Sequence, residues 1–252
     1  MIFIRTASVV VLLLGTTRVA AGQGHSQDRG HKGDHRNSNQ KGTRVGQAGE
    51  PDAVVPQQEQ RQRAKVQQQR AAEYRRQLDQ QLLAAQQQNI QLQQQRRMSQ
   101  YRTHQLYTAQ LRQQHQALLA PRDYATDPYV SAPQMYRYVA NGANRMTNQY
   151  GAEVLRQAVR NGYAQGYRAG EADKQDHSPS SYQSTFAYRD ANYGYTGRDV
   201  DQSDYNFYFR QALQRGYDDG FTHRAQYGST SNGTSTILTS LLSTILVLQP
   251  IR

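Results

Sequence analysis

The strongest constraint on this chain is a sixteen-residue phrase that occurs twice. Residues 155–170 read LRQAVRNGYAQGYRAG, and 54 residues later 209–224 read FRQALQRGYDDGFTHR, without a gap and with six identical positions. Apolar residues recur at every fourth position in both copies, which is the spacing of one helix face. These positions are Leu155, Val159, Tyr163 and Tyr167, and Phe209, Leu213, Tyr217 and Phe221. The repeat predicts two helices of one pseudo-symmetric unit, over 147–177 and 203–228.

Glycines recur beside this aromatic stripe, although each costs a helix up to ~1 kcal/mol relative to alanine. Their four-residue spacing forms a smooth strip along which another backbone can approach closely. We therefore predict that the two helices pack together, with glycines of one against tyrosine rings of the other. The predicted helix-packing residues are Gly162, Tyr163, Gly166, Tyr167, Gly170, Gly216, Tyr217, Gly220 and Phe221. The alternative is that the tyrosines face outward and stack on sugar rings or bases.

Three segments of the C-terminal half carry a resemblance to a known family. They are TNQYGAEVLRQAVRNGYAQGYRAGEADKQD, DANYGYTGRDVDQSDYNFYFRQALQRGYDDG and the terminal LQPIR. Over about 147–252 the chain resembles a family of uncharacterised exported bacterial proteins that share this duplicated arrangement. The resemblance implies export and the repeated helical architecture. It implies no activity, cofactor or catalytic residue.

Residues 57–120 differ in composition from the repeats. They contain neither glycine nor proline, and 23 of the 64 positions are glutamine. Apolar residues such as Ala71, Tyr74, Leu78 and Leu92 fall on one thin stripe at 100° per residue. A continuous helix here would be a rod of roughly 95 Å, and its thin stripe would need a partner helix, as in a coiled coil. The alternative is a disordered low-complexity tract.

The positive charge of the chain is concentrated in this segment. Residues 57–120 hold ten Arg and Lys against three acidic residues, whereas 121–252 hold thirteen basic and twelve acidic residues. A basic rod can bind a polyanion electrostatically. The candidate polyanion-binding residues are Arg61, Arg63, Lys65, Arg70, Arg75, Arg76, Arg96, Arg97 and Arg102.

The N-terminus has the pattern of an export signal. Residues 1–21 contain a cation, a short apolar run and small residues before a possible cleavage site. Residues 22–56 are polar, without periodicity, and predict a disordered linker. Cleavage after Gly22 would leave a chain starting Gln-Gly-His, whose amine, amides and His25 imidazole suit Cu(II) or Ni(II). The alternative is a polar linker that happens to contain histidines.

The remaining segments predict connections and a tail. Residues 121–146 indicate a loop with at most a short helix around 133–140, and 178–202 form a Tyr-rich linker. The stretch DVDQSD, 199–204, favours a helix cap at Ser203 or Asp204 over a calcium loop. Asp218 and Asp219 indicate a solvated helix face. The apolar segment 234–252 predicts a helix that docks on the repeats, self-associates or inserts shallowly into a membrane.

These patterns together predict an all-α, elongated protein with a long Gln/Arg-rich helix and a small helical domain. The chain has no cysteine and no recognisable catalytic or cofactor motif. We expect an exported, non-enzymatic structural or scaffolding protein of the bacterial envelope, periplasmic or secreted, that self-associates through rod and tail. The alternative is a binding module for an anionic envelope polymer or, less favoured, nucleic acid. Peripheral membrane contact through 236–248 is a further expected interaction.

Overall fold

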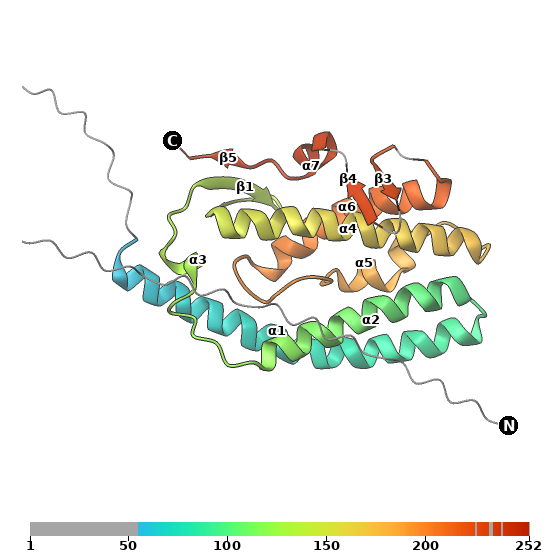
Figure 1. The fold of residues 1–252 in the computed structure, drawn as a ribbon, viewed down its shortest axis with the longest axis horizontal. Coiled ribbons are helices and arrows are strands. Elements are labelled where there is room, and N and C mark those ends of the chain that lie inside the picture. Colours follow the sequence, from blue (N-terminus) through green and yellow to red (C-terminus); the bar gives the residue numbers. More distant parts are fainter. Residues whose placement is uncertain (1–54, 225, 232–233, 238, 252) are drawn as a thin grey trace, which may run out of the picture. The chain divides into compact units, whose positions relative to one another are not determined.

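The computed structural model describes residues 55–224, 226–231, 234–237 and 239–251. The described part is mostly helical, as the sequence predicts, with short strands near its C-terminal half (Figure 1). The predicted signal peptide, the linker before Val55 and the His25 metal hypothesis lie outside the described residues. No described helix is long and apolar enough to cross a membrane.

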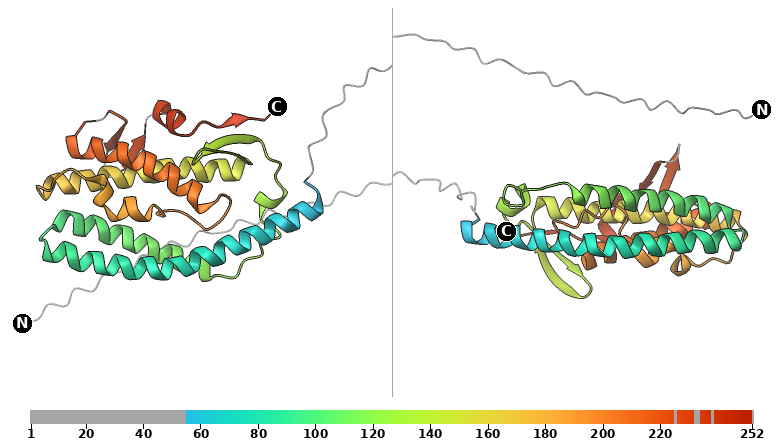
Figure 2. Two further views of the ribbon diagram at one scale, coloured as in Figure 1. Left: turned by 180° about the vertical axis from the view of Figure 1, so that it is seen from behind. Right: turned by 90° about the horizontal axis from the view of Figure 1, so that it is seen from below.

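The predicted single rod is wrong, because residues 57–120 fold back on themselves. Helix α1 spans Gln57–Gln94 and helix α2 spans Met98–Leu119. The two helices run antiparallel as a helical hairpin, in which the His104 ring nitrogen Nε2 lies 2.9 Å from the carbonyl oxygen of Ala85 (Figure 2). The partner helix that the thin apolar stripe requires is therefore supplied largely by the same segment.

The turn between these helices has no glycine or proline to mark it. Arg96 adopts a left-handed conformation with φ of 57°, which a non-glycine residue takes only at a cost. The carboxylate of Asp176, a residue far along the chain, accepts hydrogen bonds from the backbone amides of Ser99 and Gln100, each at 2.9 Å. The first amides of α2 are thus capped by a distant residue, so no local capping residue marks the break. The sequence does show an interruption of the apolar stripe here, since Arg96, Gln100 and Thr103 occupy it between Leu92 and Tyr107.

The two copies of the repeat form helices α4, Gln149–Gln175, and α6, Gln202–Thr222. Asn148 caps α4, because its side chain accepts from the amides of Tyr150 and Gly151 at 3.1 and 3.2 Å. The cap predicted for α6 is wrong. Asp201 occupies the N-cap position without a side-chain hydrogen bond, and Asp204 instead accepts from the Tyr138 hydroxyl at 2.8 Å.

Helices α4 and α6 run parallel, so the linker between them must return along the whole of α4. A helix of this length spans roughly 40 Å, which accounts for the long connection. The linker carries the 3-10 turn η1, Tyr182–Ser184, and helix α5, Phe186–Asp190. In Figure 1, α5 lies between the hairpin and the α4–α6 pair. The core therefore has three layers, with the part of the linker around α5 in the middle.

Tyrosines dominate this core. Those with 1% or less of their surface exposed are Tyr74, Tyr107, Tyr163, Tyr195, Tyr205, Tyr208 and Tyr217. They come from the hairpin, the linker and both repeat helices. A tyrosine contributes a large apolar ring, and its hydroxyl needs a hydrogen-bond partner when buried. This requirement explains the buried polar groups described below.

The loop predicted over 121–146 is instead partly ordered into regular structure. It contains helix α3, Pro128–Ser131, and strand β1, Tyr136–Ala140, which pairs antiparallel with β2, Ala143–Thr147. Asn141 and Gly142 connect the strands with φ of 50° and 77°. Asn-Gly with positive φ at both positions is the preferred two-residue hairpin turn. The short helix expected around 133–140 is therefore wrong.

The C-terminal segment is not the continuous helix predicted over 234–252. It contains an antiparallel pair, β3, Gly228–Ser231, with β4, Thr234–Ile237, then helix α7, Thr239–Ile245, and β5, Gln249–Pro250, which pairs with β1. Leu246 is buried and Leu242 is partly buried against the core. Among the alternatives for the tail, docking onto the chain's own helices is the one that these contacts fit.

Candidate functional site: the exposed basic face of the hairpin

The glycines of the repeat lie where α4 and α6 touch. A Cβ atom on Gly162, Gly166 or Gly170 would lie 2.0 to 2.2 Å from a carbonyl oxygen of α6. Gly216 and Gly220 meet the carbonyl oxygens of Tyr163 and Tyr167 on α4 in the same way, at 2.1 Å. Each glycine therefore faces the backbone of the other helix. The prediction that glycines pack against tyrosine rings is wrong in this detail, because the helices approach too closely for a ring to fit between them.

The repeat tyrosines point into the core and bind buried carboxylates. The Tyr163 hydroxyl donates to Asp219 Oδ2 at 2.9 Å, and the Tyr217 hydroxyl donates to Asp173 Oδ2 at 2.6 Å. Burial, together with the neighbouring carboxylate, raises the pKa of both tyrosines. Tyr167 and Phe221 are only partly buried at the edge of the pair. The fully buried Tyr163 and Tyr217 are not placed to stack on a sugar or a base.

Asp219 is thus a residue whose role the sequence analysis missed. Its side chain is 1% exposed and also accepts from the backbone amides of Gln226 and Tyr227, at 3.0 and 2.8 Å. The expected solvated helix face holds only for its neighbour Asp218, which is exposed. The 3.6-residue period could have indicated this, since Asp219 lies on the same side of α6 as the buried Gly216 and Gly220.

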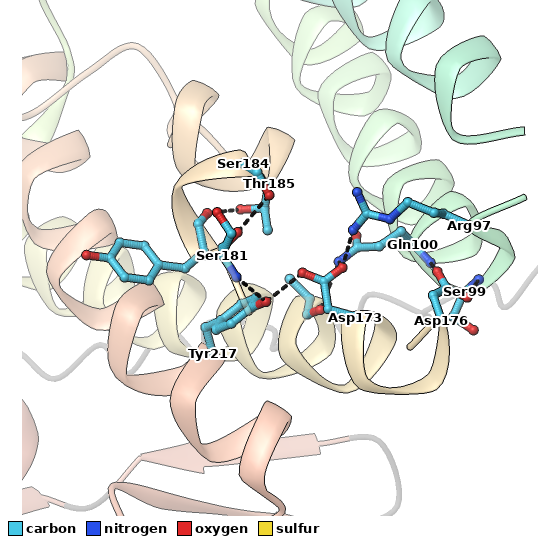
Figure 3. A network of polar contacts seen from close by, with 11 residues as sticks. Arg97, Ser99, Gln100, Asp173, Asp176, Ser181, Ser184, Thr185 and Tyr217 are labelled. Atoms are coloured by element: carbon cyan, nitrogen blue, oxygen red, sulfur yellow. Dashed lines mark hydrogen bonds and ion pairs between the residues drawn. The ribbon is translucent and has the colours of Figure 1, made fainter. Parts of the chain in front are cut away.

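Asp173 joins the hairpin to the repeat helices, as Figure 3 shows. It is fully buried, forms an ion pair with Arg97, and accepts from Gln100 Nε2 at 2.7 Å as well as from Tyr217. The Ser181 amide of the linker donates to the same Tyr217 hydroxyl at 2.9 Å. Arg97, predicted to bind a polyanion, therefore has an internal carboxylate as its partner.

Two other predicted polyanion-binding residues also have internal partners. Arg63 pairs with Glu59 at 2.7 Å and donates to the carbonyl oxygen of Ala132 at 2.7 Å. Arg70 forms an ion pair with Asp201, and the attraction of that carboxylate raises the pKa of Arg70 against the lowering effect of burial. Arg63, Arg70 and Arg97 thus stabilise the fold.

The remaining predicted cations are exposed and lie on the hairpin. Within the described residues they form no ion pair: Arg61, Lys65, Arg75 and Arg76 on α1, Arg96 in the turn, and Arg102 on α2. Arg112, which the prediction left out, belongs to the same exposed set. We call the four α1 residues the basic face. At 100° per residue they fall within an arc of about 100°, on a different side of α1 from the buried stripe.

The described residues include no group of three or more His, Cys, Asp or Glu side chains placed to hold a metal ion. His104, the buried histidine of the hairpin, has its Nε2 against a backbone carbonyl, and burial lowers its pKa. It lines a small cavity with Arg97, Thr185 and Phe186. Nothing in that arrangement pairs a nucleophile with a base. The basic face is the candidate binding surface of the described residues.

Comparison with known proteins found no matching family model, curated protein or solved structure. The resemblance of residues 147–252 to exported bacterial proteins therefore stays a prediction.

Proposed function

We propose that this chain is an exported, non-enzymatic binding module for an anionic polymer of the cell envelope, and that the basic face of α1 is its binding surface. The observation that carries the proposal is that some cations have a carboxylate partner within the fold and others do not. Arginines that face the core are paired with carboxylates, whereas Arg61, Lys65, Arg75 and Arg76 are exposed and unpaired within the described residues. Unpaired cations of one sign attract polyanions and release their counterions on binding.

The spacing of these cations favours a polymer over a small anion. Arg61 and Arg76 are separated by about 22 Å along α1 at ~1.5 Å per residue. A single phosphate or carboxylate could reach one or two of the four residues. A chain with repeated negative charges, such as peptidoglycan, an acidic polysaccharide or DNA, could contact all of them together.

The scaffolding hypothesis depends on surfaces that the fold uses internally. The stripe residues Tyr74, Leu78 and Leu92 are buried against other parts of the same chain, and so is Leu246 of the tail. Exposed apolar side chains do remain on the hairpin, among them Leu83 and Leu106 at 62% and 61%. Self-association through these residues is the competing outcome in the experiment below.

The proposal is tested by co-sedimentation of the full mature chain with purified peptidoglycan and, separately, with DNA over a salt series. A variant with Arg61→Gln, Lys65→Gln, Arg75→Gln and Arg76→Gln removes the basic face, while glutamine preserves helix propensity. A matched control removes four cations outside the hairpin that form no ion pair within the described residues: Arg137→Gln, Arg168→Gln, Arg215→Gln and Arg224→Gln.

We expect the wild type and the control to bind in a salt-sensitive way, and the basic-face variant to lose most of its binding. For DNA, the slope of log affinity against log salt should also become shallower by about 0.9 for each phosphate that the variant no longer neutralises. Equal weakening in the two variants would mean that only net charge matters and would contradict a localised surface. A stable multimer that sediments with neither polymer would favour scaffolding.

A further inference from the structure

A cavity lies between the end of α2 and the linker that precedes α6. Its volume is about 210 Å³, more than ten times the ~10–15 Å³ that one water needs. Ala117, Pro121 and Arg122 of its wall are exposed, so the cavity opens to solvent. None of the four residues of the basic face lines it. A small molecule can therefore reach side chains here that the proposed polymer-binding surface does not use.

Much of the wall of this cavity is apolar. The end of α2 and the segment after it contribute alkyl groups and one aromatic ring, from Ala117, Leu118, Ala120, Pro121 and Tyr124. The side chains of Leu118 and Tyr124 are partly exposed, so a ligand can contact them. The amide group of Gln114, which also lines the cavity, is already hydrogen-bonded within the fold. This wall therefore favours a ligand with an apolar body, whose surface it would remove from water.

Two guanidinium groups give the cavity its charge, those of Arg122 and Arg198. Both donate to the same oxygen, Oδ2 of Asp127, at 2.8 and 3.1 Å. Burial acts to raise the pKa of Asp127, but hydrogen bonds from the Tyr129 amide and from Arg122 hold that pKa below its ordinary value. This carboxylate is therefore ionised at neutral pH. Because one negative charge serves two positive charges, the site has an excess of one positive charge.

A ligand in the cavity would meet the two cations and not their carboxylate. The side chains of Arg122 and Arg198 are 43% and 21% exposed, whereas that of Asp127 is 6% exposed. A guanidinium group has five N–H donors, and within the described residues each of these two uses one of them on Asp127. The described residues that line the cavity include no acidic residue. In the same part of the chain, the neighbouring Asp199 forms no ion pair with either arginine.

We propose that this cavity binds a small carboxylic acid with an apolar body, of roughly ten heavy atoms in all. The carboxylate would accept from Arg122 and Arg198, since guanidinium groups match the geometry of a carboxylate, and the apolar body would lie along Leu118 and Tyr124. A cation would be repelled, and a neutral molecule would leave the excess charge without a partner. This inference is independent of polyanion binding, because it uses other residues and a ligand small enough to enter the cavity.

The test is a titration of the full mature chain with phenylacetate, followed by NMR through the chemical shifts of its backbone amides. Phenylacetamide has nearly the same shape without the charge, and acetate has the charge without the ring. Arg122→Gln removes one exposed cation and leaves Arg198 to pair with Asp127. Ala117→Phe fills the cavity from an exposed position of α2. Arg112→Gln, which removes an exposed cation of the same helix outside the cavity, is the matched control.

We expect phenylacetate to shift the amide signals of Leu118, Tyr124 and Thr196, and to bind the wild type and the Arg112→Gln control equally well. Phenylacetamide and acetate should each bind the wild type at least about tenfold more weakly than phenylacetate does. Phenylacetate should lose a similar factor in affinity for Arg122→Gln and for Ala117→Phe.

Thermal unfolding followed by circular dichroism shows which variants remain folded. If a cavity variant unfolds, the other variant and the comparison of the three ligands on the wild type carry the test. The proposal is overturned if phenylacetate does not bind at high millimolar concentration, or if the shifted amides lie on the basic face instead of around the cavity. It is also overturned if phenylacetamide or acetate binds as tightly as phenylacetate, or if a folded cavity variant binds phenylacetate like the wild type.

Discussion

The hairpin and the α4–α6 pair are both built from two long helices, but different forces hold them together. Helices α1 and α2 contain no glycine, and both bury side chains, among them Ala71, Tyr74 and Leu78 on α1 and His104, Tyr107 and Leu111 on α2. Helices α4 and α6 meet backbone to backbone through five glycines. The hairpin helices run antiparallel through a tight turn, whereas α4 and α6 run parallel and need the long linker.

The two helix contacts therefore differ in how well they tolerate a substitution. Side-chain contacts in the hairpin can adjust to a changed residue by moving rotamers, while a backbone carbonyl against a glycine has nowhere to move. The pair therefore provides the rigid unit on which the linker and then the hairpin pack. The hairpin carries the exposed basic face.

The largest expected effect is at the contact between the two regions. Asp173→Ala removes the carboxylate shared by Arg97, Gln100 and Tyr217. The Arg97 guanidinium loses its ion-pair partner, and the buried donors of Gln100 and Tyr217 lose their acceptor. We expect a loss of about 3 kcal/mol in the free energy of unfolding, measured by urea denaturation. Hydrogen exchange should show the hairpin amides losing protection before those of α4 and α6.

The control for this substitution is Asp79→Ala. Asp79 is 66% exposed, and the partner it has within the described residues is His115, at 3.1 Å, so its loss should cost no more than ~1 kcal/mol. Equal destabilisation by the two variants, or uniform loss of protection across all helices, would show that Asp173 does not specifically join the hairpin to the pair.

A smaller effect concerns the preference between glycine and alanine, which should be opposite in the two regions. Gly166→Ala should destabilise the protein by about 2 kcal/mol, because the clash of the new Cβ with the Leu213 carbonyl oxygen, 2.0 Å away, exceeds the gain in helix propensity. Ala84→Gly, at an exposed position of α1, should also destabilise, by about 1 kcal/mol. Alanine is thus unfavourable in one region and glycine in the other. A stabilising Gly166→Ala would disprove the close backbone contact.

The smallest expected effect is a pH dependence confined to the hairpin. Burial lowers the pKa of His104 from 6.5, so the neutral ring is favoured in the folded state. Its contribution to stability is present above pH 6.5 and is lost as the pH falls through the lower folded pKa. We expect the wild type to lose more stability than His104→Gln between pH 7.5 and pH 5. A variant with the same pH profile as the wild type would contradict this assignment.

The parts predicted well from sequence are those where local pattern and tertiary environment agree. The four-residue spacing of Leu155, Val159 and Tyr163 predicts a buried helix face, and all three side chains are fully buried. At the hairpin turn around Arg96 the sequence shows only an interrupted apolar stripe, and the cap of α2 comes from Asp176, eighty residues further along the chain. The Asn-Gly sequence at 141–142 is a signal for a β-hairpin turn, and the prediction of a loop over 121–146 did not use it.

For the candidate site, too, one part could be predicted from the sequence and another part could not. Composition alone located the positive charge in 57–120, because Arg and Lys can be counted. Which of them are available to a partner depends on the carboxylates that folding places beside Arg70 and Arg97, and those carboxylates lie about 130 and 75 residues away. No local pattern carries that information.

The sequence by itself determined the helical class, the two repeat helices and the strip of glycines, because helix periodicity and conformational cost act within a few residues. Only the tertiary structure decided that the Gln-rich segment folds back, that α4 and α6 lie parallel, and which arginines are internal. Those outcomes depend on pairing buried charges and tyrosine hydroxyls with partners far apart in the chain, since a buried polar group left unpaired costs more than a local preference can supply.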